Sequence, residues 1–255
     1  MGEPYVANSV EASAVLKSGW DFLSKHINKL WPVAILLALP TILSAFSTRN
    51  VKKTEFKYEN LTDFSSFTES VFGVSAATFG AAILLFLFVS IIYSAFVYSG
   101  SLKLMLKSLR GHTTEFKLGD IFRVGRKYLG RFVLLTIAGG VIIFLGFLLL
   151  IIPGLIAIFL LSLALHFMVD KDLGVSESLS SSYRTIKSNA SSVFMVYLGL
   201  ILVGLVVSIA GSILFGANTW FTRVLSAGLD GFVSLYGLIV VTKLYLALIG
   251  KTAPK

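Results

Sequence analysis

The sequence contains no cysteine and few charged residues. Its 255 residues include no Cys and 3 His, and Asp, Glu, Lys and Arg together make up only 14%. The absence of cysteine excludes a disulfide framework, a zinc–thiolate site and thiol catalysis. Soluble globular proteins carry about 25% charged residues. The low charge, beside a hydrophobic content of 56%, therefore indicates a membrane protein rather than a soluble or disordered one.

Long apolar runs support this interpretation. Residues 132–152, 191–215 and 231–249 hold few or no charges, and each run has the length of about 20 residues that a helix needs to cross the hydrocarbon layer. We predict an all-α fold with one integral membrane domain over residues 1–255 and six transmembrane helices in three hairpins. The predicted spans are about 30–47, 76–102, 131–151, 154–170, 191–215 and 228–250.

Proline and glycine mark the predicted helix breaks. Ile152-Pro153-Gly154 lies between the third and fourth spans. Proline cannot continue a helix and glycine permits a reversal, so this tripeptide predicts a tight turn. A single bent helix of about 40 residues is the alternative. In the first span, Pro40 is expected to kink or end the helix.

Three cytoplasmic segments have the spacing of amphipathic helices. They cover about residues 9–29, 116–129 and 175–189, and apolar residues recur in them at helical intervals between charged ones. Such segments are too polar to span a membrane and are suited to lie in the headgroup plane. Each precedes a pair of spans, which gives a threefold repeat of interfacial helix, span, turn and span.

Lysine and arginine predict the orientation. Of the 22 basic residues, 17 fall on the side of the predicted spans that carries both termini and 5 fall on the other side. Basic residues are enriched in cytoplasmic loops. We therefore expect a multi-pass protein of the plasma membrane with both termini in the cytoplasm.

A resemblance to a known family appears over residues 152–193. The run holds the Pro153-Gly154 turn, an apolar span ending at Asp170, an interfacial segment with Leu179 and Ser182, and then Lys187. It resembles the prokaryotic membrane proteins grouped with the glycerophosphoryl diester phosphodiesterase membrane domain, although Ser178 stands where alanine is usual. The resemblance covers about 42 residues well and the six-span plan loosely. Its elements are structural, so it implies a fold and no activity, and we expect no phosphodiesterase domain in this chain.

The sequence offers little catalytic chemistry. His26, His112 and His166 lie in distant segments, so no clustered histidine metal site is predicted. Neither a nucleophile-elbow motif nor a phosphate-binding loop occurs. We predict a protein that is not an enzyme and that needs no cofactor or metal.

Three polar residues within the spans are functional candidates, namely His166, Asp230 and Lys243. Ionisable groups are costly in hydrocarbon and mark functional sites by default. A simpler interpretation is that Lys243 reaches the interface, Asp230 caps its helix or meets Arg223, and His166 hydrogen-bonds a neighbour. A proton or substrate relay would need all three to line one cavity.

A basic linker suggests contacts with lipid. The linker before the third span carries Arg123, Arg126, Lys127 and Arg131, which we predict to contact anionic lipid headgroups. The alternative is that these charges serve only to set the topology of the spans.

In the fifth span, Gly204, Ser208 and Ser212 are spaced four apart, as are Ala227 and Gly231 in the sixth. Small residues at this spacing favour internal helix packing, with a homodimer interface as the alternative.

Three functions follow from these features. The first is a non-enzymatic membrane protein that acts through anionic lipids on the cytoplasmic face or through a membrane-protein partner, as an accessory subunit, scaffold or membrane-organising factor. Nucleic acid is not an expected partner. The second is a small permease or channel subunit that uses the polar residues of the sixth span. The third, a lipid-directed enzyme, has only Asp170, Asp172 and Glu177 as candidates, and a solvated loop accounts for these better.

Overall fold

A computed structural model describes residues 10–47, 75–111, 117–214 and 220–252, and the structural statements below concern these residues. The chain ends and the predicted loop between the first two spans lie outside them. The described residues form helices joined by short turns: α1 (Ala12–Ser47), α3 (Ala76–Leu109), α4 (Leu118–Leu149), α5 (Ile151–Leu161), α6 (Ala164–Lys171), α7 (Val175–Ser188), α8 (Ala190–Leu214) and α9 (Trp220–Thr252).

The prediction of six apolar spans is confirmed. Six helical segments are long and apolar enough to cross a membrane. They are Ala12–Leu43, Ala77–Leu109, Leu118–Leu149, Ile151–Lys171, Ala190–Leu214 and Phe221–Gly250. The chain is therefore a multi-pass, all-helical protein over the part that the structure describes.

Two of the predicted interfacial helices are not separate elements. The described parts of the segments predicted at 9–29 and 116–129 form the N-terminal turns of α1 and α4, which continue without a break into the spans. Gly130 does not end α4, because one glycine in a helix interior costs only about 1 kcal/mol. Pro40 also lies inside α1, which runs on to Ser47. The segment 175–189 alone forms a helix of its own, α7.

The reversal between α4 and α5 lies at Leu150, three residues before Pro153. Leu150 is extended, with φ −166° and ψ 159°, and separates the two helices. A Cβ added to Gly146 would lie 2.9 Å from the Cα of Gly154, so residues on either side of Leu150 are in contact and the chain turns back. Pro153 lies in the first turn of α5, where backbone N–H groups have no partner within the helix. The missing N–H of proline therefore costs no hydrogen bond. A single bent helix is not formed.

The predicted fourth span is interrupted after Leu161. Ser182, a buried residue of α7, donates a hydrogen bond to the carbonyl of Leu160 (2.7 Å) and accepts one from the amide of Leu163 (3.2 Å). A helix break leaves backbone groups without partners. The Ser182 hydroxyl supplies partners on both sides of this break, which fixes α7 across the junction of α5 and α6.

The core occupies one end of the molecule. α1 packs mainly along α9, and α3 along α4. Gly100 allows the second pair to approach closely, since a Cβ there would lie 2.2 Å from the carbonyl oxygen of Ile121. The buried apolar residues of α3, α4 and α9 lie mostly in 95–106, 121–135 and 235–248.

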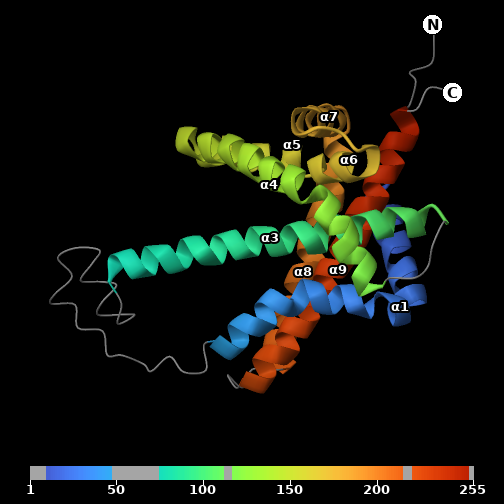
Figure 1. Cartoon of the computed structure of the whole chain (residues 1–255). Helices are drawn as coiled ribbons and strands as arrows, with labels where there is room; N and C mark the ends of the chain where they lie inside the picture. The colour runs from blue at the N-terminus through green and yellow to red at the C-terminus, as the bar shows by residue number, and fades with distance from the viewer. Residues whose placement is uncertain (1–9, 48–74, 112–116, 215–219, 253–255) are drawn as a thin grey trace, which may run out of the picture.

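The other halves of the same helices diverge. In α3, Ile83 through Val89 are each 43–69% exposed, so every face of the helix is open. The tip joining α4 to α5 is equally exposed, at 68–75% for Leu148 through Ile152. We call these exposed parts of α3 and of α4–α5 the apolar arms. Figure 1 shows both arms projecting away from the part of the bundle near the two termini. The molecule is compact at one end and splayed at the other.

Replacing Ser182 by alanine tests the bridging hydrogen bonds. We expect Ser182→Ala to lower the free energy of unfolding by about 1–3 kcal/mol, because the buried Leu163 amide loses its acceptor. Thermal unfolding in detergent measures the change. Ser180→Ala is the matched control, since Ser180 is exposed on the same helix, and it should shift stability by less than about 0.5 kcal/mol. Equal effects of the two variants would contradict this role of Ser182.

Candidate functional site

A buried carboxylate, Asp170, lies at the end of α6. Its side chain is 4% exposed, and both oxygens accept hydrogen bonds from Arg110, from Nη1 at 2.6 Å and from Nη2 at 2.8 Å. The Tyr245 hydroxyl donates a third bond to Oδ2 at 2.9 Å. A charge buried this deeply requires such partners. Asp170 thus joins α3, α6 and α9, and the prediction that it lies in a solvated loop is wrong.

The second acidic residue, Asp172, ends α6 in the left-handed conformation, with φ 55°. Its carboxylate accepts hydrogen bonds from Arg131 Nη1 at 2.7 Å and Lys127 Nζ at 3.4 Å. Arg131 also donates to the backbone carbonyl of Asp172 at 3.1 Å. Desolvation acts to raise the pKa of Asp172, but the hydrogen bonds and positive charges of Lys127 and Arg131 outweigh it and hold that pKa below its ordinary value.

The last turn of α6 also receives side-chain donors at its backbone. The carbonyl of Val169 accepts hydrogen bonds from Lys103 Nζ at 2.8 Å and from the Tyr128 hydroxyl at 3.2 Å. The final carbonyls of a helix lack partners within the helix, and cations are favoured at its negative end. Lys103 meets both requirements.

We call this group the α6 exit cluster. It comprises Lys103, Arg110, Lys127, Tyr128, Arg131, Asp170, Asp172 and Tyr245. Its four cations exceed its two carboxylates, which gives a formal charge of +2. The cluster joins the ends of four helices and leaves an excess of positive charge beside them.

The third acidic candidate, Glu177, has a local role. Its carboxylate accepts a hydrogen bond from the Gly174 amide at 3.3 Å, in the first turn of α7. Acidic side chains near a helix N-terminus stabilise that end. Asp170, Asp172 and Glu177 therefore all have partners in the fold.

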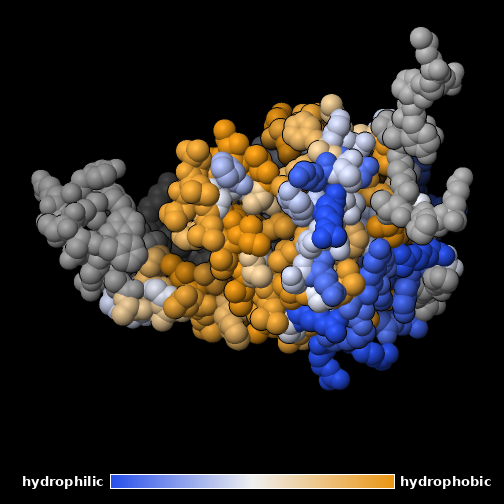
Figure 2. All heavy atoms as spheres, turned by 90° about the horizontal axis from the view of Figure 1, so that it is seen from above, coloured by the Kyte–Doolittle hydropathy of each residue, from blue (hydrophilic) through white to orange (hydrophobic). Residues whose placement is uncertain are grey.

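The four predicted headgroup contacts divide into two kinds. Lys127 and Arg131 belong to the α6 exit cluster. Arg123 is 80% exposed and lies 3.3 Å from Asp120, while Arg126 is exposed and forms no ion pair with a described residue. Figure 2 shows the hydrophilic residues gathered over one side of the molecule, beside a broad apolar surface. Arg123 and Arg126 are the members of the predicted set that remain available to a ligand.

The three polar candidates of the spans have different neighbours. His166 is buried, with Nε2 3.4 Å from the Thr242 hydroxyl oxygen and the ring centroid 5.4 Å from that of Tyr245. Lys243 instead faces α1, where Nζ donates to the carbonyl of Ser18. Asp230 is exposed on α9. The structure does not bring the three residues together.

The small residues of α8 and α9 differ in their surroundings. Gly231 packs on α1, since a Cβ there would lie 2.5 Å from the carbonyl oxygen of Ala34. Ser208 and Ser212 are exposed, and a Cβ added to Gly204 would meet no described atom within 4 Å. Internal packing therefore holds for Gly231, while the face of Gly204, Ser208 and Ser212 packs on no described helix.

Sequence reasoning missed the partners of Asp170. Arg110 and Tyr245 are 60 and 75 residues away along the chain, and no motif or periodicity connects positions so far apart. The usable signal was an acidic residue at the end of an apolar run, which requires a cationic partner if it is buried. Within the described residues, no group of three or more His, Cys, Asp or Glu is placed to hold a metal ion.

Removing the guanidinium of Arg110 should destabilise the fold. Arg110→Ala leaves the Asp170 carboxylate buried with Tyr245 as its remaining side-chain partner, and breaking such a pair costs about 3 kcal/mol. Thermal unfolding in detergent measures this loss. The control is Lys107→Ala, because Lys107 is an exposed cation one turn earlier on α3.

A double-mutant cycle isolates the pair itself. Asp170→Ala combined with Arg110→Ala should cost less than the sum of the two single changes, since the second change removes a charge that the first left unpaired. Additive effects, or an Arg110→Ala effect no larger than that of Lys107→Ala, would contradict the assignment.

Comparison with known proteins gives one family match. A family described as "Domain of unknown function (DUF7847)" matches residues 121–251, which is 131 of the 255 residues. The matched segment contains the α6 exit cluster except Lys103 and Arg110. No curated protein and no solved structure matches the chain. The match includes residues 152–193, but it does not show the glycerophosphoryl diester phosphodiesterase membrane-domain family, so that resemblance stays a prediction.

Proposed function

The chain belongs to this DUF7847 family, and on that premise we propose that it is a non-enzymatic integral membrane protein. It acts through lipid or protein contacts, as an accessory subunit, scaffold or membrane-organising factor. The observation that supports this function best is the separation of charge from apolar surface. The four cations of the α6 exit cluster lie at the compact end of the bundle, and the spans open their apolar faces at the other end.

In this proposal the compact, basic end faces the cytoplasm of a plasma membrane, with both termini on that side. The 17 to 5 distribution of Lys and Arg supports this orientation. The six spans form three hairpins, and the polar first turns of α1 and α4 lie at headgroup depth. α7 lies there too: it buries Ser178, Ser182 and Ile186 on one face. This arrangement is also what the resemblance to the phosphodiesterase membrane-domain proteins implies.

Anionic lipid headgroups are the proposed ligands of the basic end. A cation close to an anionic leaflet contributes about 1 kcal/mol of attraction. Arg123 and Arg126 are exposed on one helix, next to a cluster that already carries a formal excess of positive charge. Both side chains are open to the phosphate groups of neighbouring lipids.

Protein contacts are proposed for the apolar arms. A helix such as α3, with Ile83 through Val89 exposed on every face, must be covered by lipid chains or by spans of another protein. A permease would instead need polar groups around one passage. His166 and Lys243 face different helices, so that alternative gains no support.

Native mass spectrometry of the protein, extracted gently from its own membrane, tests the proposed function. We expect either a stoichiometric protein companion or retained anionic lipid. The double variant Arg123→Ala/Arg126→Ala should retain fewer anionic lipids, because it removes two exposed cations of α4. Its control is Lys52→Ala/Lys53→Ala, which removes the same charge from the predicted outer loop. A bare chain with neither companion nor anionic lipid would overturn the proposal.

Single cysteines test the orientation. The natural chain has no cysteine, so each introduced thiol reports on one position. With a membrane-impermeant maleimide, Ser65→Cys in the predicted outer loop should react in intact cells. Ser180→Cys on α7 should react only after the membrane is permeabilised. The reverse pattern would place the basic end outside the cell.

A further inference from the structure

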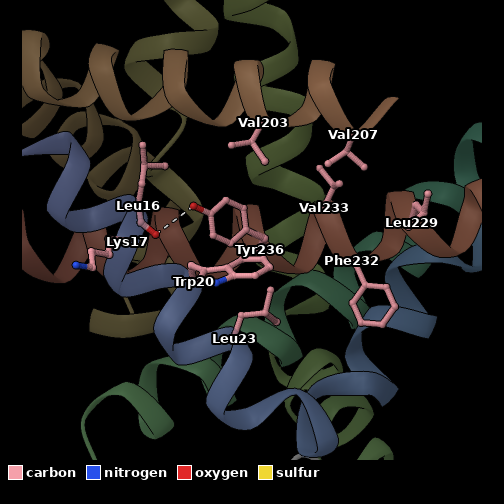
Figure 3. A pocket seen from close by; sticks show the side chains of 10 residues that line it. All are labelled: Leu16, Lys17, Trp20, Leu23, Val203, Val207, Leu229, Phe232, Val233 and Tyr236. Atoms are coloured by element: carbon pink, nitrogen blue, oxygen red, sulfur yellow. Dashed lines mark hydrogen bonds between the residues drawn. The ribbon is translucent and has the colours of Figure 1, made fainter. Parts of the chain in front are cut away.

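An apolar cavity lies between α1, α8 and α9. Its volume is about 480 Å³, within the range of about 300–1,000 Å³ that is typical of small-molecule sites. Figure 3 shows the side chains that line it, spread between Lys17 at one end and Leu229 at the other. The lining consists of Leu16, Lys17, Trp20, Leu23, Val203, Val207, Leu229, Phe232, Val233 and Tyr236.

Two close contacts of α8 bound this cavity. Near the Lys17 end, a Cβ added to Gly199 would lie 2.5 Å from the Leu16 side chain, so α8 touches α1 there. Near the other end, a Cβ on Gly211 would lie 3.5 Å from the Leu229 side chain of α9. Val203 and Val207, spaced one helical turn apart between these contacts, line the space that remains.

The lining selects a hydrocarbon occupant. Lys17 is the only charged residue among the ten, and the Tyr236 hydroxyl already donates to the carbonyl of Leu16 at 3.1 Å. Trp20 packs edge-on against the Tyr236 ring, with centroids 6.3 Å apart. A polar ligand would lose its water here and gain few hydrogen bonds in exchange. An apolar chain has no hydrogen bonds to lose on entering.

The position of the cavity connects it with the bilayer. All three lining helices are candidate spans, and Val203 and Phe232 are 37% and 39% exposed at its side. Lipid chains would therefore reach it from the hydrocarbon layer.

The Lys17 end has the character of a membrane interface. Trp20 is 61% exposed there, and tryptophan is enriched at headgroup level. The Lys17 side chain points out of the cavity (Figure 3), is exposed, and forms no ion pair with the described residues. A cation at the end of an apolar cavity is complementary to a molecule with an apolar chain and an anionic headgroup.

We propose that this cavity binds one chain of an anionic membrane lipid, whose headgroup phosphate lies at Lys17. This inference deepens the proposed function and rests on it, because it names the lipid class and a place in the fold. The site is distinct from Arg123 and Arg126, which lie on α4.

A photoreactive lipid tests the site. The probe is phosphatidylglycerol with a diazirine in its acyl chain, reconstituted in vesicles with the full-length protein, and the labelled peptides are mapped by mass spectrometry. We expect labelling of the α8 and α9 segments that contain Val207 and Phe232. Val207→Trp should reduce it several-fold by filling the cavity. Val206→Trp is the matched control, since Val206 is 66% exposed on the same helix and should leave the labelling unchanged.

The headgroup contact has its own variant. Lys17→Ala should weaken labelling by the phosphatidylglycerol probe about fivefold, and should not change labelling by the matching phosphatidylcholine probe. Val203→Trp replaces Val207→Trp if the latter fails to fold, as judged by circular dichroism and thermal unfolding.

Two results would overturn the site. One is equal labelling of Val206→Trp and of a folded cavity-filling variant. The other is labelling by both probes that Lys17→Ala leaves unchanged. Arg123→Ala/Arg126→Ala should retain the cavity labelling, so loss of lipid at α4 and loss of lipid at the cavity are read separately.

Discussion

The burial of the Asp170 carboxylate is the constraint on which the arrangement of the helices depends. A charge that is 4% exposed persists only with strong hydrogen-bond donors around it, and Arg110 and Tyr245 supply them from two other helices. Two residues later, Asp172 receives Arg131 and Lys127 from α4. The short helix α6 is therefore the point at which α3, α4 and α9 are held, and every one of these bonds is made within one helical turn of its end.

This concentration of polar contacts explains the splayed shape. Apolar spans gain little free energy by packing on one another in a bilayer, because lipid chains are equally apolar. Helices held together at one end by ion pairs and hydrogen bonds are thus free to diverge at the other. In α3 the result is the exposed run from Ile83 through Val89. The same donors that hold α6 also bring surplus cations to this end, so the architecture itself produces a basic surface beside apolar arms.

Hydropathy alone predicted the six apolar helices, because length and composition are local properties. The positions at which helices begin and end were predicted less well from the sequence. α1 and α4 run through the predicted boundaries of the interfacial helices, and the chain reverses at Leu150 rather than at Pro153. The α6 exit cluster could not be predicted, since its partners are 41 to 75 residues apart. The two small-residue patterns show the same limit. Gly231 packs on α1 and Gly204 packs on no described helix, although their spacing in the sequence is identical.

The cavity between α1, α8 and α9 follows from the same balance of forces. α8 approaches α1 at Gly199 and α9 at Gly211, where small residues permit close contact. Between these points the branched side chains of Val203 and Val207 line the cavity, and no ion pair among the described residues of α8 draws it inward. Unless a molecule fills it, an apolar space of this size leaves its lining without dispersion partners. In a bilayer, lipid chains surround the helices and supply these dispersion contacts. The lipid that we propose there therefore acts as a component of the fold rather than as a substrate.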